Sequence, residues 1–324
     1  MGWSLSAFYS AVETGKSRVQ ARVVLLAPGL EEKVMKRKKN KEMRDTEMKN
    51  RDVKNKDIKN KNTKKSKKTV LAVLGGAAIV AAAAAAGIGI TAASNVKAMN
   101  QTIEAAMSEL ERFGTVTAED PGEYKVMKLN PLMKFDVEQY QVEGLGNLSV
   151  MKVNMGVMQM ATFVITPLEK NMPLLSADYM YILGSRKSYL EFYDVVEQKD
   201  EEYQKLMDRL LTVLAQYEDL EAIETSPAWY QDLLTVTAYK GGGSQEDVRL
   251  QNMLTESVGA YMEHAADLPA LSEEGRREKR RITEAYTDGL IEKGGISTDV
   301  FKGSLGDEKT RDFFGKVFFG TEKE

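Results

Sequence analysis

The chain has 324 residues, which favours one or two domains, and its 43% hydrophobic content can supply a sizeable core. It contains no cysteine, which excludes disulfides, thiol nucleophiles, iron–sulfur clusters and zinc sites with cysteine ligands. A single histidine, His264, excludes a histidine-rich metal site and an ordinary Ser-His-Asp triad. We therefore expect no metal site.

Charge divides the sequence into two unlike parts. The overall net charge is −3, but residues 35–68 carry a net charge of +11 and residues 94–324 a net charge of −15. Residues 1–34 show no sustained hydrophobic period, and their role is not indicated by the sequence. Residues 35–68 and 94–324 are therefore expected to have different environments.

Residues 35–68 form a low-complexity basic flank. A five-residue repeat begins at Lys49, Lys54 and Lys59, and few apolar residues accompany it. Such a composition cannot offset the entropy of ordering the chain, so disorder is expected. Lysine density alone would suit nucleic acid, but no aromatic residues are interleaved. We favour a solvated flank that touches anionic lipid, with no nucleic-acid partner.

Residues 69–93 contain no charged side chain. A helix of this length can span the hydrocarbon core of a bilayer. A secretory signal cleaved near residues 92–94 and a buried core helix are the alternatives, but the run exceeds a usual signal core and its flank is too polar for a core helix. We expect a single-pass membrane helix, with residues 35–93 in contact with lipid. The basic flank predicts a cytoplasmic N-terminus and an extracytoplasmic domain from residue 94 onward.

Residues 94–324 read as helix, strands, then helices. An amphipathic helix is predicted at 96–113, two or three strands within 124–155, and further strands at 160–166, 179–183 and 188–196. Ser226-Pro227 predicts a helix through Leu234, and residues 241–244 a flexible loop. Other helices are expected at 201–217, 247–264 and 273–291. This order predicts an α+β domain with a mostly antiparallel sheet covered on both faces.

Asp178 stands where an apolar strand begins, inside the run Pro-Leu-Leu-Ser-Ala-Asp. A carboxylate that enters a buried sheet has to be paired, protonated or functional, because burying it as a bare ion is too costly. An aspartate that caps a turn before the strand is the simpler alternative.

A resemblance rests on this stretch. Residues 172–178, residues 184–190 with their Gly-Ser-Arg-Lys turn, and the aromatic-rich tail 292–320 resemble the ferredoxin-dependent bilin reductases over roughly residues 130–320. The resemblance implies a three-layer α/β/α sandwich with a central antiparallel sheet. It also implies an oxidoreductase that reduces a linear tetrapyrrole such as biliverdin, with electrons from ferredoxin or flavodoxin, protons from side chains and no tightly bound cofactor.

The resemblance also implies roles for particular residues. Asp178 matches the family's catalytic aspartate, and a carboxyl group buried beside an apolar ligand is expected to have a raised pKa suited to proton donation. Arg186 and Lys187 match the basic turn that faces the propionates. Thr162 falls where many members carry His or Asn, and can hydrogen-bond a bilin without protonating it. Asp194 or Glu191 could supply a second carboxylate.

Two departures keep the function open. Lys152 falls where some members carry a catalytic glutamate, and Gly294-Gly295 where some carry a polar contact residue. The net charge of −15 also disfavours an acidic electron donor, which prefers a basic docking face. A non-catalytic module for a tetrapyrrole or another hydrophobic ligand, or a tethered interaction domain, is therefore the alternative to an enzyme.

Overall fold

The computed structural model describes residues 89–131, 133–294 and 296–322. The predicted segments 1–34 and 35–68, and residues 69–88 of the expected membrane helix, lie outside the described residues. Within those ranges, no helix combines the length and the hydropathy needed to cross a membrane. The membrane helix therefore stays a prediction.

One antiparallel sheet organises the described residues. Its strands lie in the order β1-β3-β4-β5-β6-β7-β9-β8, and β2 also pairs with β3. The strands are β1 (Val116–Glu119), β2 (Val126–Asn130), β3 (Met133–Val142), β4 (Gly146–Asn154), β5 (Met158–Pro167), β6 (Leu174–Ile182), β7 (Ser185–Tyr193), β8 (Glu221–Ala222) and β9 (Leu234–Gly243). The predicted antiparallel sheet is confirmed, and the motif of residues 172–178 runs into a central strand. The expected start of that strand near residue 179 is wrong, because β6 begins at Leu174 and Asp178 lies at its middle.

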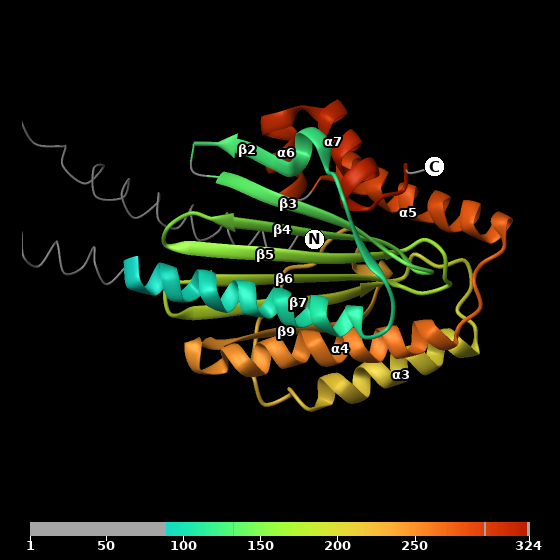
Figure 1. Ribbon diagram of the computed structural model, residues 1–324, viewed down its shortest axis with the longest axis horizontal. Coiled ribbons are helices and arrows are strands. Elements are labelled where there is room, and N and C mark those ends of the chain that lie inside the picture. Colours follow the sequence, from blue (N-terminus) through green and yellow to red (C-terminus); the bar gives the residue numbers. More distant parts are fainter. Residues whose placement is uncertain (1–88, 132, 295, 323–324) are drawn as a thin grey trace, which may run out of the picture. The chain divides into compact units, whose positions relative to one another are not determined.

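Helices cover both faces of this sheet, as Figure 1 shows. One face, called here the α4 face, is covered by the helix of residues 89–111, α3 (Glu201–Ala215) and α4 (Asp247–Asp267). The other, the α5 face, is covered by α5 (Glu273–Lys293), α6 (Ile296–Leu305), α7 (Asp307–Phe313) and a π-helical turn, Phe314–Phe318. The α+β class and three layers are therefore as predicted.

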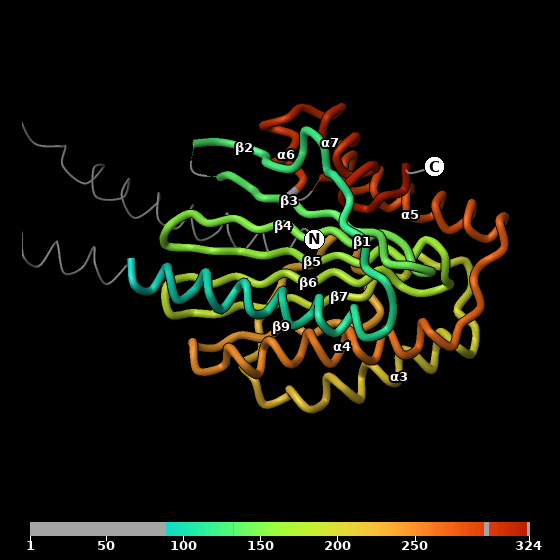
Figure 2. Tube along the Cα trace, in the orientation of Figure 1, coloured from blue at the N-terminus to red at the C-terminus, as the bar shows by residue number. Residues whose placement is uncertain are grey.

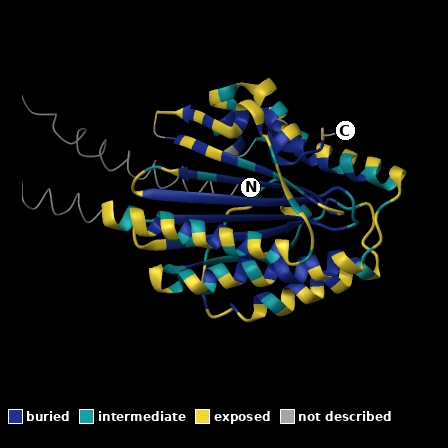
Figure 3. Ribbon diagram, in the orientation of Figure 1, coloured by how far each residue is buried: buried dark blue, intermediate teal, exposed yellow. Residues whose placement is uncertain are grey.

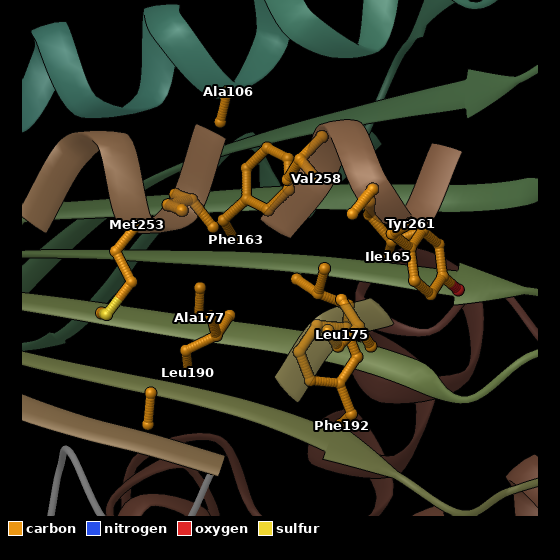
Figure 4. Close-up of a cluster of buried hydrophobic side chains, with 14 of the residues drawn as sticks. Ala106, Phe163, Ile165, Leu175, Ala177, Leu190, Phe192, Met253, Val258 and Tyr261 are labelled. Carbon is orange, nitrogen blue, oxygen red and sulfur yellow. The ribbon is translucent and has the colours of Figure 1, made fainter. Parts of the chain in front are cut away.

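Alternation along the central strands builds two separate cores. Successive side chains of a strand point to opposite faces, so Phe163, Ala177 and Leu190 pack toward α4. Figure 4 shows these residues facing Met253, Val258 and Tyr261 of α4. The intervening residues pack toward the C-terminal helices, and the central strands are dark blue, meaning buried, in Figure 3. A polar side chain of a central strand can therefore contribute to a site on only one of the two faces, the α4 face or the α5 face.

Two sequence predictions around residues 226–244 are wrong. The expected helix after Ser226 is replaced by a short 3-10 turn, Gln231–Leu233, followed by β9. The β-branched run from Leu234 to Tyr239 prefers a strand that pairs with β7. The expected loop at 241–244 continues that strand through Gly243, opposite Ser185. A Cβ on Gly241 would lie 3.2 Å from the Arg186 carbonyl oxygen, so glycine permits this close pairing.

The helix predictions at 201–217, 247–264 and 273–291 are confirmed, with shifts of a few residues at their ends. The helix predicted at 96–113 is present at 89–111, so it begins at least seven residues early and includes residues 89–93 of the expected membrane helix. Asp200 caps α3 by accepting the Tyr203 amide at 2.8 Å, and Ser272 caps α5 by accepting the Gly275 amide at 3.1 Å. These caps set where each helix begins, and so which residues of α5 lie over the sheet.

Candidate functional site

Asp178 lies on the α5 face of β6 and is 2% exposed. Its neighbours in the strand, Ala177 and Tyr179, belong to the opposite core, so the alternation directs Asp178 toward the C-terminal helices. Thr162 stands directly opposite on β5, and its hydroxyl donates a hydrogen bond to Asp178 Oδ1. The structure therefore brings together two of the predicted site residues.

The residues opposite one another on the next two strands, β7 and β9, extend the line of side chains formed by Thr162 and Asp178. Tyr189 of β7 is opposite Asp178, and Tyr239 of β9 is opposite Tyr189, with ring centroids 5.8 Å apart. Burial, followed by the charges of Asp178 and Glu191, raises the pKa of the Tyr189 phenol to about 12. The phenol therefore stays protonated at neutral pH and remains a potential hydrogen-bond donor.

A second buried carboxylate stands two residues further along β7. Glu191 is 1% exposed and accepts hydrogen bonds from the Tyr193 hydroxyl at 2.6 Å and the Tyr239 hydroxyl at 2.8 Å. Ser176 is opposite on β6, and its buried hydroxyl has no hydrogen-bond partner among the described residues. Because Glu191 and Asp178 share the α5 face, they form one buried acidic strip crossed by tyrosines.

Aromatic rings form a roof over this strip. The Tyr193 ring centroid lies 5.1 Å from that of Tyr286 on α5 and 5.8 Å from that of Tyr230. Trp229 packs edge-on against Tyr230 at 5.3 Å. Burial raises the pKa of Tyr193 and of Tyr286 well above the ordinary value for a phenol. These phenols are neutral, so the strip is enclosed by apolar rings that carry hydrogen-bonding hydroxyls.

The structure separates the two basic residues predicted to hold propionates. Arg186 points to the α4 face, where its guanidinium pairs with Asp247 and lies 5.0 Å from the centre of the Tyr181 ring. The structure therefore does not bring Arg186 to Asp178. Lys187, the next residue, takes the α5 face opposite Met180 and is partly exposed. Lys187 alone of the pair can face a ligand beside Asp178.

Asp194 also lies away from the strip. It follows the last residue of β7, and its carboxylate pairs with Lys199. Five residues separate it from Tyr189, or roughly 17 Å at the usual rise of a strand. The second carboxylate of the site is Glu191, which the sequence offered only as the alternative to Asp194.

Among the hollows that the described residues line are two on the surface, and neither of these is lined by Asp178 or Glu191. One, of about 540 Å³, is lined by Glu197 and by residues at the start of α5. The other, of about 470 Å³, lies between the helix of residues 89–111 and strands β3 and β4. Among the described residues, no group of three or more histidine or acidic side chains is arranged to hold a metal ion.

The sequence matches no family model and no curated protein. The structure matches a crystal structure of phytochromobilin synthase from tomato in complex with biliverdin, with a TM-score of 0.55 and 13% sequence identity. The match covers 68% of this chain and 83% of the tomato chain. The domain shares the fold of phytochromobilin synthase. The α+β architecture inferred from the sequence thus has a solved counterpart.

Proposed function

We propose that the α5 face of the sheet binds a linear tetrapyrrole such as biliverdin, and that the protein reduces it. The observation that carries this proposal is the buried strip of Thr162, Asp178 and Glu191 beneath the C-terminal helices. The fold supports it, because the tomato phytochromobilin synthase structure of the same fold contains biliverdin.

Each side chain of the strip has a defined task in this proposal. Reduction of one bilin double bond takes two electrons and two protons, and the electrons come from an external carrier of the ferredoxin or flavodoxin class. Asp178 donates a proton to the tetrapyrrole, and the Thr162 hydroxyl orients that carboxyl group. Glu191, which accepts from two tyrosines, is a second acid through which a proton can be replaced. Lys187 offers a cation to one propionate.

Binding requires the aromatic roof to move. Tyr193, Tyr230 and Tyr286 fill the space over Glu191. A flat conjugated ligand can exchange these ring contacts for its own, so the roof supplies both the space and the apolar surface for a tetrapyrrole. Trp229 belongs to this roof and is a natural fluorescent reporter of such an exchange.

A non-catalytic binding module is the second candidate function. It is favoured by the placement of Arg186 on the opposite face, which leaves Lys187 as the one member of the predicted propionate pair on the site face. Such a module would hold a bilin or another hydrophobic ligand without turnover. A tethered interaction domain that takes no ligand is the remaining alternative.

We also propose that residues 69–93 anchor the protein in a membrane, with the basic flank cytoplasmic and the folded domain outside. In this arrangement the electron carrier would have to lie on the extracytoplasmic side. Protease added to intact cells should digest the domain after Ser94 and leave the lysine repeat protected. Protection of the domain would reverse the orientation.

The test of the ligand proposal is a titration of the purified chain with biliverdin, followed by absorption and by tryptophan fluorescence. We expect a shifted bilin absorption band and quenching of the Trp229 fluorescence. The variant Trp3→Phe lacks the only other tryptophan, so its fluorescence comes from Trp229 alone and should still be quenched. Addition of a one-electron reductant then separates enzyme from binder, since only an enzyme bleaches the band catalytically. An unshifted band with unquenched fluorescence would contradict both readings.

A further inference from the structure

Large apolar side chains are exposed at one end of the domain. Six large hydrophobic side chains of the described residues are strongly exposed, and two of them lie in turns, Val157 between β4 and β5 and Leu183 between β6 and β7. Two more belong to segments that bond to the second turn: Ile90 stands five residues before Asn95, which donates to the Leu183 carbonyl, and Val248 follows Asp247, which pairs with Arg186. These four, called here the hairpin rim, are Ile90 at 72%, Val248 at 65%, Val157 at 50% and Leu183 at 45% exposed. Such a gathering is unusual on a surface that meets only water.

The backbone of Leu183 holds the rim together. Its amide donates to the Val157 carbonyl at 3.1 Å, and its carbonyl accepts from the Asn95 side chain at 3.0 Å and from Arg186 at 3.2 Å. The same Arg186 guanidinium pairs with Asp247, the residue before Val248. Four elements of the chain therefore converge on one hairpin tip. Figure 2 shows the helix of residues 89–111 starting at the end of the domain where these hairpins turn.

Leu183 also has a costly backbone conformation. Its φ of +53° is the only positive value among non-glycine residues of the described chain. A leucine in this region is disfavoured, whereas asparagine or glycine would be relaxed in a two-residue hairpin turn. An apolar side chain that is exposed and strained at a hairpin tip indicates that the side chain has a partner at that place.

The sequence indicates what kind of partner the Leu183 side chain has. The uncharged run ends at Ala93, and Asn95, two residues later, donates to the Leu183 carbonyl. Residues 93 and 95 are about 3 Å apart along a helix axis, so the hairpin tip lies level with the end of the apolar run. If that run occupies the hydrocarbon core, the tip reaches the headgroup region of the same bilayer.

The charges near the rim suit such a surface. Arg186 is paired with Asp247, whereas Arg249 pairs with Asp219 at 2.6 Å and lies 3.8 Å from Glu246. Lys97 has no ion pair with any described residue, and an ammonium group at this level can meet lipid phosphates. Asp247 is thus neutralised by Arg186, while the cation of Lys97 remains available.

We propose that the hairpin rim lies in the surface of a lipid bilayer and fixes the orientation of the domain relative to it. This inference rests on the proposed membrane anchor and is independent of bilin chemistry. Leu183 and Val157 enter the headgroup region. Arg186 stabilises the hairpin tip by donating to the Leu183 carbonyl while it pairs with Asp247.

The chain has no cysteine, so single-cysteine variants of the full chain can be labelled specifically. Leu183→Cys and Val157→Cys report on the rim, and Leu211→Cys of α3, 54% exposed, is the matched control. Each variant carries a polarity-sensitive fluorophore and is reconstituted into phosphatidylcholine and phosphatidylglycerol vesicles. Circular dichroism checks that each variant is folded.

We expect brominated lipids to quench the probes at 183 and 157 several-fold more than the probe at 211, and aqueous iodide to show the opposite order. Iodide quenching at 183 and 157 equal to that at 211, in chains that stay with the vesicles, would overturn the rim and leave the anchor intact. A chain that does not stay with the vesicles after alkaline carbonate treatment would overturn both.

Discussion

Thr162 donates a hydrogen bond to Asp178 from the directly opposite position on the neighbouring strand. Both side chains are 2% exposed, so this bond is made in the interior between the sheet and the C-terminal helices. The pair explains how the sheet can accommodate a carboxyl group at its centre. It also fixes the direction in which that group points, which the proposed chemistry requires.

Replacing Thr162 tests how much the pair contributes to stability. Thr162→Val keeps the shape but removes the donor, and should lower the free energy of unfolding by about 1–3 kcal/mol, since a buried acceptor loses a hydrogen bond. Thr162→Ser keeps the hydroxyl and should recover most of that loss. Urea unfolding monitored by Trp229 fluorescence provides the measurement. Equal stabilities for the valine and serine variants would show that the bond contributes nothing.

Tyr239 and Tyr140 each form a hydrogen bond with a glutamate, which is buried for Tyr239 and partly exposed for Tyr140. Each phenol donates to a glutamate at 2.8 Å, but Glu191 is 1% exposed whereas Glu138 is 39% exposed. Tyr239→Phe should cost about 1–3 kcal/mol, and Tyr140→Phe less than about 1 kcal/mol because water replaces the lost donor. Denaturant unfolding of both variants decides the matter. A larger loss at Tyr140 would contradict the buried network.

Lys279 of α5 predicts a specific pH dependence of stability. Its ammonium is buried and donates to the carbonyls of Met172 at 2.6 Å and Val195 at 2.5 Å. Desolvation lowers its pKa to about 7, against an opposing effect of Asp194. Above pH 7 the unfolded chain therefore binds more protons at this residue than the folded chain does, and the free energy of unfolding should rise with pH.

The window for this measurement is pH 7 to about 9, because the tyrosines of the unfolded chain begin to ionise near pH 10 and lower stability there. Lys279→Met removes the titrating group and should flatten the rise. The difference between wild type and variant, measured by urea unfolding at several pH values, isolates the lysine. Parallel curves for the two proteins would show that Lys279 keeps the same pKa in both states.

The sequence predicted the sheet and most helices because their hydrophobic periods are long and regular. The order helix, strands, helices was sufficient for the α+β class, and the motif ending at Asp178 identified a central strand. The helix expected after Ser226 was wrong because a local cap signal competed with a strand that is stabilised by pairing with β7. Pairing between distant segments leaves little trace in local sequence.

The face on which a predicted site residue lies follows from the alternation of side chains along its strand. On β7, residues 189, 191 and 193 face α5, whereas 186, 188, 190 and 192 face α4. Arg186 and Lys187 could therefore never both face a ligand at Asp178. The sequence left Asp194 and Glu191 as alternatives because the apolar run extends to Val196, whereas β7 ends at Tyr193. Counting alternate residues from Tyr189, the partner of Asp178, would have selected Glu191.

The sharpest measurement compares wild type with Asp178→Asn for biliverdin binding and reduction. Asparagine keeps the size of the side chain but cannot donate the proton of an acid. We predict nearly unchanged affinity, an altered spectrum of the bound bilin and a loss of reduction by about 10²–10⁴-fold, the usual contribution of a general acid. Asp178→Glu, which keeps the acid, should retain part of the activity. Equal reduction rates and identical bound spectra for wild type and Asp178→Asn would contradict the account.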